Sequence, residues 1–340
     1  MVRLILEVSV VPILAKQNLI MTSHKKKETH FVSQISNYLM ALRPRQWTKN
    51  LVIFAAPLFS FTISPQTLLV SLLAFLLFCC VSSSFYLFND IADVESDRQH
   101  PVKCNRPIAS GLVNIRVAFG MAVVLLIGAL ITSWIIAPKL CATLTTYAIL
   151  QIAYNLRVKH MVILDIGAIA IGFVLRAIAG ASATNIVLST WFLLCTAMLA
   201  LFLAIEKRKA ELRLTQIKCI KPRAVLRHYS LSLLARMENV VTAGTIVTYA
   251  LWSSGPSLQG ASTSWMLLTL PFVLYGVFRY QLLSDPQEVA NQREDEMDRG
   301  GCSERPEEVL LKDASILTTV CGWAITCFTI LWLKHQGLII

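Results

Sequence analysis

Long hydrophobic stretches without charged residues alternate along the chain with shorter polar segments. A helix needs about 20 apolar residues to cross a bilayer, and several of these stretches reach or exceed that length. The pattern therefore predicts an all-α polytopic membrane protein. The uncharged stretches cover residues 50–89, 117–138, 140–156, 177–205, 239–278 and 314–333.

Turn-forming residues divide these stretches into nine predicted transmembrane helices. Ser64-Pro65 interrupts the first stretch, a Ser-Gly-Pro-rich segment at 253–257 interrupts the stretch 239–278, and residues 182–185 separate two further spans. The predicted spans are 47–63, 67–88, 116–136, 139–156, 162–182, 188–206, 238–254, 263–283 and 314–333.

The basic residues predict how these spans are oriented. Of the 31 Lys and Arg, 28 fall in one set of alternating segments, namely the N-terminal segment, 89–116, 156–160, 206–238 and 279–313. Only Lys139 and Lys334 lie on the other side. By the positive-inside rule, we expect a cytoplasmic N-terminus, an outside C-terminus and a site facing the cytoplasm. The location predicted for the chain is the plasma or inner membrane.

The composition agrees with this interpretation and excludes two others. Hydrophobic residues make up 55% of the 340 residues and charged residues only 15%, which is atypical of a soluble domain. The net charge of +11 follows from the asymmetric loops, so we expect no nucleic-acid partner. The nine cysteines lie mostly in spans and form no C-x-x-C pair, so neither a disulfide framework nor a zinc site is expected.

The N-terminal segment differs from the rest of the chain. Residues 1–40 combine a short apolar stretch with the basic run Lys25-Lys26-Lys27 and lack a clear cleavage site. We expect residues 1–40 to be a disordered extension and residues 41–340 to form one transmembrane catalytic domain.

Three carboxylates follow the second predicted span. Asp90, Asp93 and Asp97 have i, i+3, i+7 spacing, so a helix would place them on one face, bordered by Asn89. Carboxylates stacked in this way repel one another unless a cation neutralises them. Mg²⁺ suits such a site because it combines a few carboxylates with phosphate oxygens of a substrate. The alternative is an acidic helix end neutralised by neighbouring bases.

Other polar residues lie at the ends of spans or inside them. Asp165 and Arg176 share nearly one face of a predicted span, about 16 Å apart along its axis. An arginine within a span is a functional candidate, although a structural ion pair or carbonyl cap would also explain it. Tyrosines and bases at span ends could contact phosphate, or could be interfacial anchors and surface charge. The phosphate-binding candidates are Lys49, Asn89, Lys103, Arg106, Tyr154, Arg157, Lys159, Arg176, Lys207 and Arg208.

The motif Asn89-Asp90-x-x-Asp93-x-x-x-Asp97 resembles the first aspartate-rich motif of the UbiA superfamily of membrane prenyltransferases. Within that superfamily the chain is most similar to the decaprenyl-phosphate phosphoribosyltransferase branch, over roughly residues 40–335. The similar segments are 42–50, 100–103 with 106–111, 154–160 with Asp165, 172–177, 206–212, and 305–308 before Lys312-Asp313.

This resemblance implies a nine-helix bundle with a cytoplasmic active site and an Mg²⁺-dependent transferase. The implied reaction moves 5-phosphoribose from phosphoribosyl pyrophosphate (PRPP) to a polyprenyl, decaprenyl-type phosphate, releasing pyrophosphate. Asp90, Asp93 and Asp97 would be catalytic metal ligands, and catalytic Asp165 would orient a ribose hydroxyl or a metal-bound water. A role in cell-wall biosynthesis is also implied.

Two departures from the superfamily pattern affect this interpretation. Superfamily members that use a prenyl diphosphate carry a second aspartate-rich motif after the sixth span, where this chain has Glu206-Lys207-Arg208-Lys209-Ala210-Glu211. Bases at this place favour direct phosphate binding. Cys104 stands where the branch would have another base.

Two other functions remain as alternatives. A UbiA-type aromatic prenyltransferase with a polyprenyl diphosphate donor would keep the first motif but also needs the second. A non-catalytic carrier of a phosphorylated solute would need polar residues across the bundle, whereas the far-side loops are almost uncharged.

Overall fold

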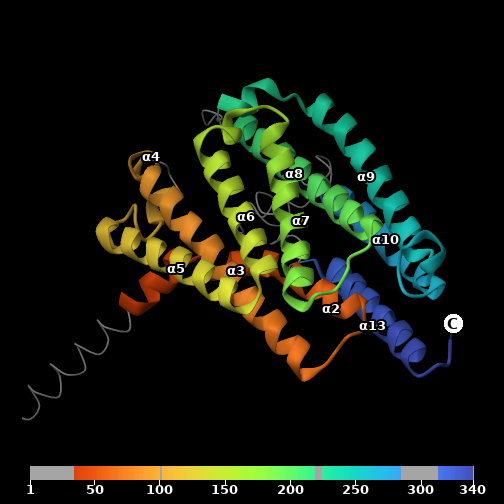
Figure 1. Cartoon of the computed structure of the whole chain (residues 1–340). Helices are drawn as coiled ribbons and strands as arrows, with labels where there is room; N and C mark the ends of the chain where they lie inside the picture. The colour runs from red at the N-terminus through yellow and green to blue at the C-terminus, as the bar shows by residue number, and fades with distance from the viewer. Residues whose placement is uncertain (1–33, 100–101, 219–223, 285–312, 340) are drawn as a thin grey trace, which may run out of the picture. The chain divides into compact units, whose positions relative to one another are not determined.

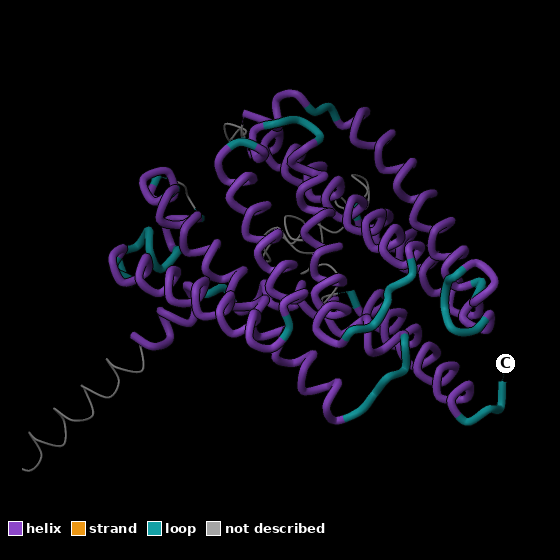
Figure 2. The backbone as a smooth tube through the Cα atoms, viewed as in Figure 1, coloured by secondary structure: helices purple, strands orange, loops and turns teal. Residues whose placement is uncertain are grey.

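The computed structural model describes residues 34–99, 102–218, 224–284 and 313–339, and every regular element in them is helical (Figure 2). The described residues form two compact units. The first comprises residues up to Thr48 together with Cys80–Ile127, and the second comprises Lys49–Cys79 together with the chain from Gly128 onward.

The first unit contains the end of helix α3 (Pro65–Ala92), the short helix α4 (Val94–Arg98), the 3-10 turn η2 (Lys103–Asn105) and the start of α5 (Ile115–Ile136). Its core consists of small and aliphatic side chains, including Ala41, Leu87, Ile108, Val113 and Ala118. These side chains join the end of α3 to the loop before α5. The carboxylates that follow Leu87 are therefore attached to a packed core.

The second unit contains the remaining long helices. They are α6 (Pro138–Leu156), α7 (Leu164–Thr184), α8 (Thr190–Lys218), α9 (Leu231–Ser253), α10 (Leu270–Leu283) and α13 (Ala314–His335). Consecutive helices from α6 to α9 pack against one another, and α10 packs against α13 (Figure 1). Short elements connect or precede them, namely η1 (Pro44–Phe54), which begins in the first unit, α2 (Ala55–Phe59), η3 (Val158–His160), η4 (Ala224–His228), η5 (Pro256–Leu258) and η6 (Ser264–Thr269).

A close backbone contact holds η1 against α7. A Cβ atom added to Gly180 would lie 2.0 Å from the carbonyl oxygen of Ile53, which no side chain can tolerate without movement of the backbone. Small residues allow helices in membranes to approach one another closely. Gly180 therefore permits this packing.

Six helices in the described residues are long and apolar enough to cross a membrane: Pro65–Ala92, Ile115–Ile136, Leu164–Thr184, Thr190–Arg213, Ser264–Leu283 and Ala314–His335. The prediction of an all-helical, multi-pass membrane protein is therefore confirmed. The other predicted spans, 47–63, 139–156 and 238–254, coincide with helical segments that are not among these six candidate membrane spans.

Two predicted boundaries differ from the structure. The first span is a 3-10 helix followed by α2 and ends at Phe59, while α8 continues past residue 206 to Lys218. Helix α8 continues because Glu206, Arg208 and Lys209 are buried and paired, so these charges do not end it.

Some predicted segments lie outside the described residues. They include most of the N-terminal extension, the start of the 100–103 motif, and the segment from Arg305 to Lys312. The last part of the extension, residues 34–40, is helical.

Candidate functional site

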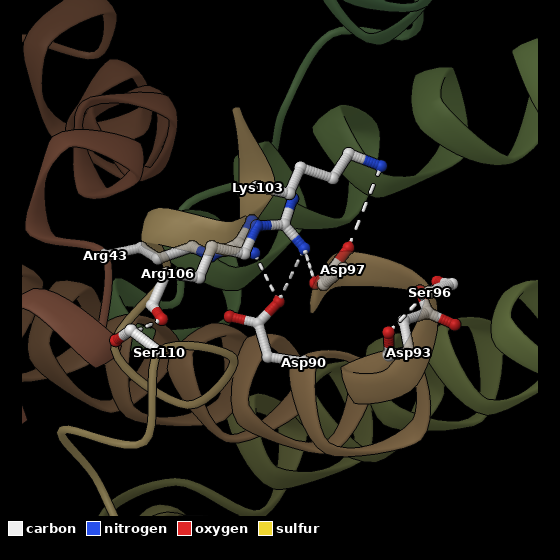
Figure 3. Close-up of polar contacts among 8 residues, drawn as sticks. All are labelled: Arg43, Asp90, Asp93, Ser96, Asp97, Lys103, Arg106 and Ser110. Carbon is white, nitrogen blue, oxygen red and sulfur yellow. Dashed lines mark hydrogen bonds and ion pairs between the residues drawn. The ribbon is translucent and has the colours of Figure 1, made fainter. Parts of the chain in front are cut away.

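Asp90 and Asp97 form a compact ionic cluster with one arginine of the following loop. Both carboxylates are buried. Arg106 Nη1 donates to Asp90 Oδ1 at 3.0 Å and to Asp97 Oδ2 at 2.5 Å (Figure 3). The two carboxylates therefore converge on a single cationic nitrogen, as their shared helical face predicts.

Two further bases complete this cluster. Arg43 Nη2 donates to Asp90 Oδ1 at 2.5 Å, and its guanidinium lies 5.1 Å from the ring centre of Tyr86. Lys103 Nζ lies 4.0 Å from Asp97 Oδ1. The predicted residues Lys103 and Arg106 are thus placed beside the predicted acids. Arg43 was not among the candidates, although it lies within the similar segment 42–50.

Asp93 occupies a different position from the other two acids. It lies at the junction where α3 ends and α4 begins, with φ −95° and ψ 8°. The helical hydrogen bonding continues across it, from Asp93 N to Asn89 O at 2.9 Å and from Asp97 N to Asp93 O at 2.8 Å. Its side chain is half-buried and lies beside Ser96, away from the carboxylate oxygens that Arg106 joins (Figure 3).

The predicted metal triad is only partly assembled. In the parts of the chain that the structure describes, no group of three or more His, Cys, Asp or Glu is arranged to hold a metal ion. The oxygens of Asp90 and Asp97 nevertheless converge on one cation, Arg106. Hard carboxylate oxygens are the ligands that Mg²⁺ prefers, with waters and substrate phosphate filling the remaining positions. The donor set therefore fits Mg²⁺.

A second polar cluster, in the second unit, surrounds Asp165 in the first turn of α7. Its side chain is completely buried, and Oδ2 accepts a hydrogen bond from Arg208 Nε at 2.8 Å. Arg208, on α8, also donates to Glu211 Oε2 at 2.5 Å. The structure thus brings together two predicted site residues that lie far apart in the sequence.

Tyr229 completes this second cluster. Its hydroxyl donates to Asp165 Oδ1 at 2.7 Å and accepts from the backbone N–H of Ile163 at 2.7 Å. Burial raises the pKa of Tyr229 to about 12, so the hydroxyl keeps its proton near neutral pH. Sequence reasoning missed Tyr229, because no motif surrounds it.

A buried ion network lies beside this cluster on α8. Lys209 Nζ donates to Glu206 Oε1 at 2.8 Å and to Glu238 Oε2 of α9. Gln281 of α10 donates to the other oxygen of Glu238 at 2.8 Å. The bases in the segment 206–211 are therefore held largely by the chain's own acids.

Arg176 lies deep in α7 among polar and aromatic groups. It donates to Asn50 Oδ1 at 2.7 Å, to the carbonyl of Gly172 at 2.7 Å and to the hydroxyl of Tyr147 at 3.2 Å. Its guanidinium also lies 5.0–5.3 Å from three ring centres, those of Phe78, Tyr147 and Phe173. These contacts join α7 to α6 and η1, and the phosphate-binding role of Arg176 stays a prediction.

The remaining candidates lie near the ends of α3 and α6, in the loop after α6, and within η1 and α8. Arg157 is exposed, whereas the others are half-buried: Lys49, Asn89, Tyr154, Lys159 and Lys207. Tyr154 lies near enough to Arg208 to interact with it electrostatically. Cys104, which replaces an expected base, is half-buried in η2.

Comparison with known sequences finds a family and named relatives. A profile described as the UbiA prenyltransferase family matches residues 51–295. The decaprenyl-phosphate phosphoribosyltransferase of Mycolicibacterium smegmatis is 36% identical over 303 residues, covering 85% of this chain and 90% of the relative. The protein of the same name from Corynebacterium glutamicum is 34% identical over 292 residues, covering 84% of this chain and 83% of the relative.

Solved structures share the fold at low sequence identity. A UbiA homolog from Archaeoglobus fulgidus, bound to DMAPP and Mg²⁺, matches with a TM-score of 0.59 at 19% identity, covering 86% of this chain and 99% of that chain. A structure of digeranylgeranylglyceryl phosphate synthase matches with a TM-score of 0.60 at 18% identity, covering 87% and 99%. At these identities the likeness concerns the fold.

Proposed function

Because this chain belongs to the UbiA prenyltransferase family, we propose that it is a membrane phosphoribosyltransferase. It transfers 5-phosphoribose from PRPP to a polyprenyl, decaprenyl-type phosphate and releases pyrophosphate, giving a polyprenylphosphoryl-5-phosphoribose. The observation that carries this proposal is the identity with named decaprenyl-phosphate phosphoribosyltransferases along most of both chains. A role in cell-wall biosynthesis belongs to the same proposal.

The membrane topology that we propose favours a reaction at the cytoplasmic face. We propose nine spans in residues 41–340, with residues 1–40 as an extension on the cytoplasmic side and the C-terminus outside. The polar residues of the α3–α5 loop and of the loops after α6 and α8 then belong to the basic, cytoplasmic set. A soluble, anionic donor such as PRPP reaches that face from the cytoplasm.

Asp90 and Asp97 would hold Mg²⁺, and Asp93 at the adjoining helix junction is the third proposed ligand. The ion supplies positive charge to the pyrophosphate of the donor. Arg43, Lys103 and Arg106 lie within this same cluster. Their charges both hold the two carboxylates in place and attract a multiply charged anion.

The second cluster holds the carboxylate of Asp165 beside the guanidinium of Arg208. Asp165 is held by Arg208 and by Tyr229, so its carboxylate has a defined orientation. Its proposed role is to orient a ribose hydroxyl or a metal-bound water. Tyr154, Arg157, Lys159 and Lys207 are the proposed contacts for phosphate oxygens. Lys49, Asn89 and Arg176 complete the proposed set.

The chemistry requires no general base. A phosphate oxygen of the lipid, already anionic near neutral pH, forms a bond to C1 of the ribose while the bond from C1 to the pyrophosphate oxygen breaks. Fixed positive charges around the leaving pyrophosphate stabilise the charge that develops on it. Attack on the side opposite the leaving group inverts C1 and gives a β-linked product.

The test uses purified protein in nanodiscs with Mg²⁺ and a short polyprenyl phosphate. Radiolabelled PRPP is supplied in one arm, and geranylgeranyl diphosphate with aromatic acceptors in the other. We expect label from PRPP to enter the organic phase, and EDTA to prevent it. Prenylation of an aromatic acceptor without transfer from PRPP would contradict the proposal and favour the aromatic prenyltransferase.

A further inference from the structure

Ile163 has a backbone conformation that β-branched residues rarely adopt. It directly precedes α7 and has φ 70° and ψ −44°. A positive φ brings the Cβ atom of a branched residue close to its own backbone. Strained residues of this kind persist only where the surrounding structure holds them, and they occur often at functional sites.

The hydroxyl of Tyr229 holds the strained residue. It accepts the hydrogen bond from Ile163 N and donates to Asp165, each at 2.7 Å. The ring is buried in a hydrophobic core that also contains Ile166, Val225 and Leu226. One rigid side chain, 66 positions along the chain from Ile163, thus fixes both the strained backbone and the first-turn acid of α7.

The segment held in this way is short, basic and internally bonded. Residues 157–163 connect α6 to α7 and carry Arg157, Lys159 and His160. Backbone hydrogen bonds close it, from His160 N to Arg157 O and from Met161 N to Val158 O, both at 3.0 Å. The segment is also bonded to both neighbouring helices, through Arg157 N to Ala153 O of α6 at 3.0 Å and through Asp165 N of α7 to Met161 O at 3.1 Å. The conformation of Ile163 therefore affects where the segment lies between them.

We propose that Tyr229 is a positioning residue which sets the place of this basic loop, and that Arg157 and Lys159 of the loop bind a phosphate group of the donor. The inference rests on the proposed function. Glycine adopts a positive φ without strain, whereas isoleucine does not. The hydrogen bond from Ile163 N to the Tyr229 hydroxyl is therefore needed to hold the positive φ at this position. The strained residue and the hydrogen bond from its N–H to Tyr229 together fix the place of the loop.

The first test is Tyr229→Phe, which keeps the buried ring and removes only the hydroxyl. We expect KM for PRPP to rise about tenfold, equivalent to about 1.4 kcal/mol, while kcat changes less than KM. The matched control is Tyr275→Phe, since Tyr275 is an exposed tyrosine on α10. The control should keep the KM of the wild type.

The decisive test adds Ile163→Gly to Tyr229→Phe. Glycine removes the strain, so the loop keeps its place without the hydroxyl and KM should return to within about threefold of the wild type. Ile163 is exposed, so its truncation removes little packing. A double variant no better than Tyr229→Phe would overturn the inference, as would an unchanged KM in the single variant.

A measurement without donor separates this inference from the proposed function. Hydrogen exchange of the backbone amides in residues 158–163 should be at least about tenfold faster in Tyr229→Phe than in the wild type. It should slow again when Ile163→Gly is added. Unchanged exchange contradicts the positioning role, whereas a wild-type protein that transfers nothing from PRPP contradicts the proposed function.

Discussion

Asp165 and Arg208 form a buried ion pair of 2.8 Å between α7 and α8, although 43 positions separate them in the sequence. The side chain of Asp165 is fully buried and that of Arg208 is 2% exposed. Each of these buried charges is stabilised by the other, because neither can be hydrated in the folded protein. The pair therefore joins a helix end to the middle of its neighbour while presenting one carboxylate in a fixed orientation.

Removing the acid should destabilise the protein. Asp165→Ala leaves Arg208 with Glu211 as a remaining partner, so the loss of stability should stay below the cost of a fully unpaired buried charge, about 3–5 kcal/mol. Asp165→Asn, which can still accept hydrogen bonds, should lose less. Thermal unfolding in detergent measures both variants. An Asp165→Ala protein as stable as the wild type would show that the pair is hydrated and not buried.

The two carboxylates that share Arg106 should be needed for turnover and not for folding. Asp90→Asn and Asp97→Asn keep the size and the accepting oxygen of each side chain. Each should lower turnover by about 100-fold or more, because losing a group that only supports a metal ligand already costs about 10–100-fold. The matched control is Glu95→Gln on the same short helix as Asp97, since Glu95 is exposed and pairs with Arg98 at 2.9 Å, outside the cluster around Arg106. Full activity in either asparagine variant would exclude the metal role.

Metal removal should have an effect that depends on these same acids. EDTA should abolish transfer from PRPP in the wild type, and added Mg²⁺ should restore it. In Asp97→Asn the Mg²⁺ concentration for half-maximal rate should rise, because one carboxylate ligand is lost. An Mg²⁺ dependence identical to that of the wild type would place the metal elsewhere.

The helices could be predicted because long uncharged stretches are a strong signal for spans. The end of α8 could not be predicted in this way. The prediction ended the span at the first charges, whereas Glu206 and Lys209 are paired within the protein and the helix continues past them. Asp90 and Asp97 were found from their spacing on one helix. Arg43 and Tyr229 were missed because each reaches its acid across a long sequence separation, which a local pattern does not record.

Arg176 illustrates a second limit of sequence reasoning. Its position within a span predicts an interior-facing, functional arginine. The structure agrees that it faces the interior, where Asn50, Tyr147 and the carbonyl of Gly172 accept its hydrogen bonds. Hydroxyl, amide and ring partners leave no charge pattern in the sequence, so they could not be anticipated.

Acid should destabilise α13 at its N-cap, Asp313. Asp313 caps this helix by accepting from Ile316 N at 2.8 Å, and its hydrogen bond from Arg279 lowers the pKa of the carboxyl. A pKa that is lower in the folded protein gives stability above the unfolded pKa, about 3.9, and this stability is lost as the pH falls through the folded pKa. The melting temperature of the wild type should therefore fall toward that of Asp313→Asn as the pH drops below about 4.

A second substitution separates the charge of Asp313 from its capping bond. Asn caps helices about as well as Asp, whereas Ala does not. Asp313→Ala should thus melt below Asp313→Asn at every pH. A constant difference between wild type and Asp313→Asn from pH 6 to pH 3 would contradict the titration.

The packing of η1 on α7 makes a prediction about two glycines of one helix. A methyl group at Gly180 would meet the Ile53 carbonyl oxygen at 2.0 Å, whereas a methyl group at Gly167 would meet nothing within 4 Å. Gly180→Ala should destabilise the protein by about 1–3 kcal/mol, since a backbone must move to admit the methyl group. Gly167→Ala should be neutral or stabilise α7 by up to about 1 kcal/mol, because alanine favours helix. Thermal unfolding of both variants in the same detergent gives the comparison, and the opposite ranking would show that η1 does not pack on α7 at this position.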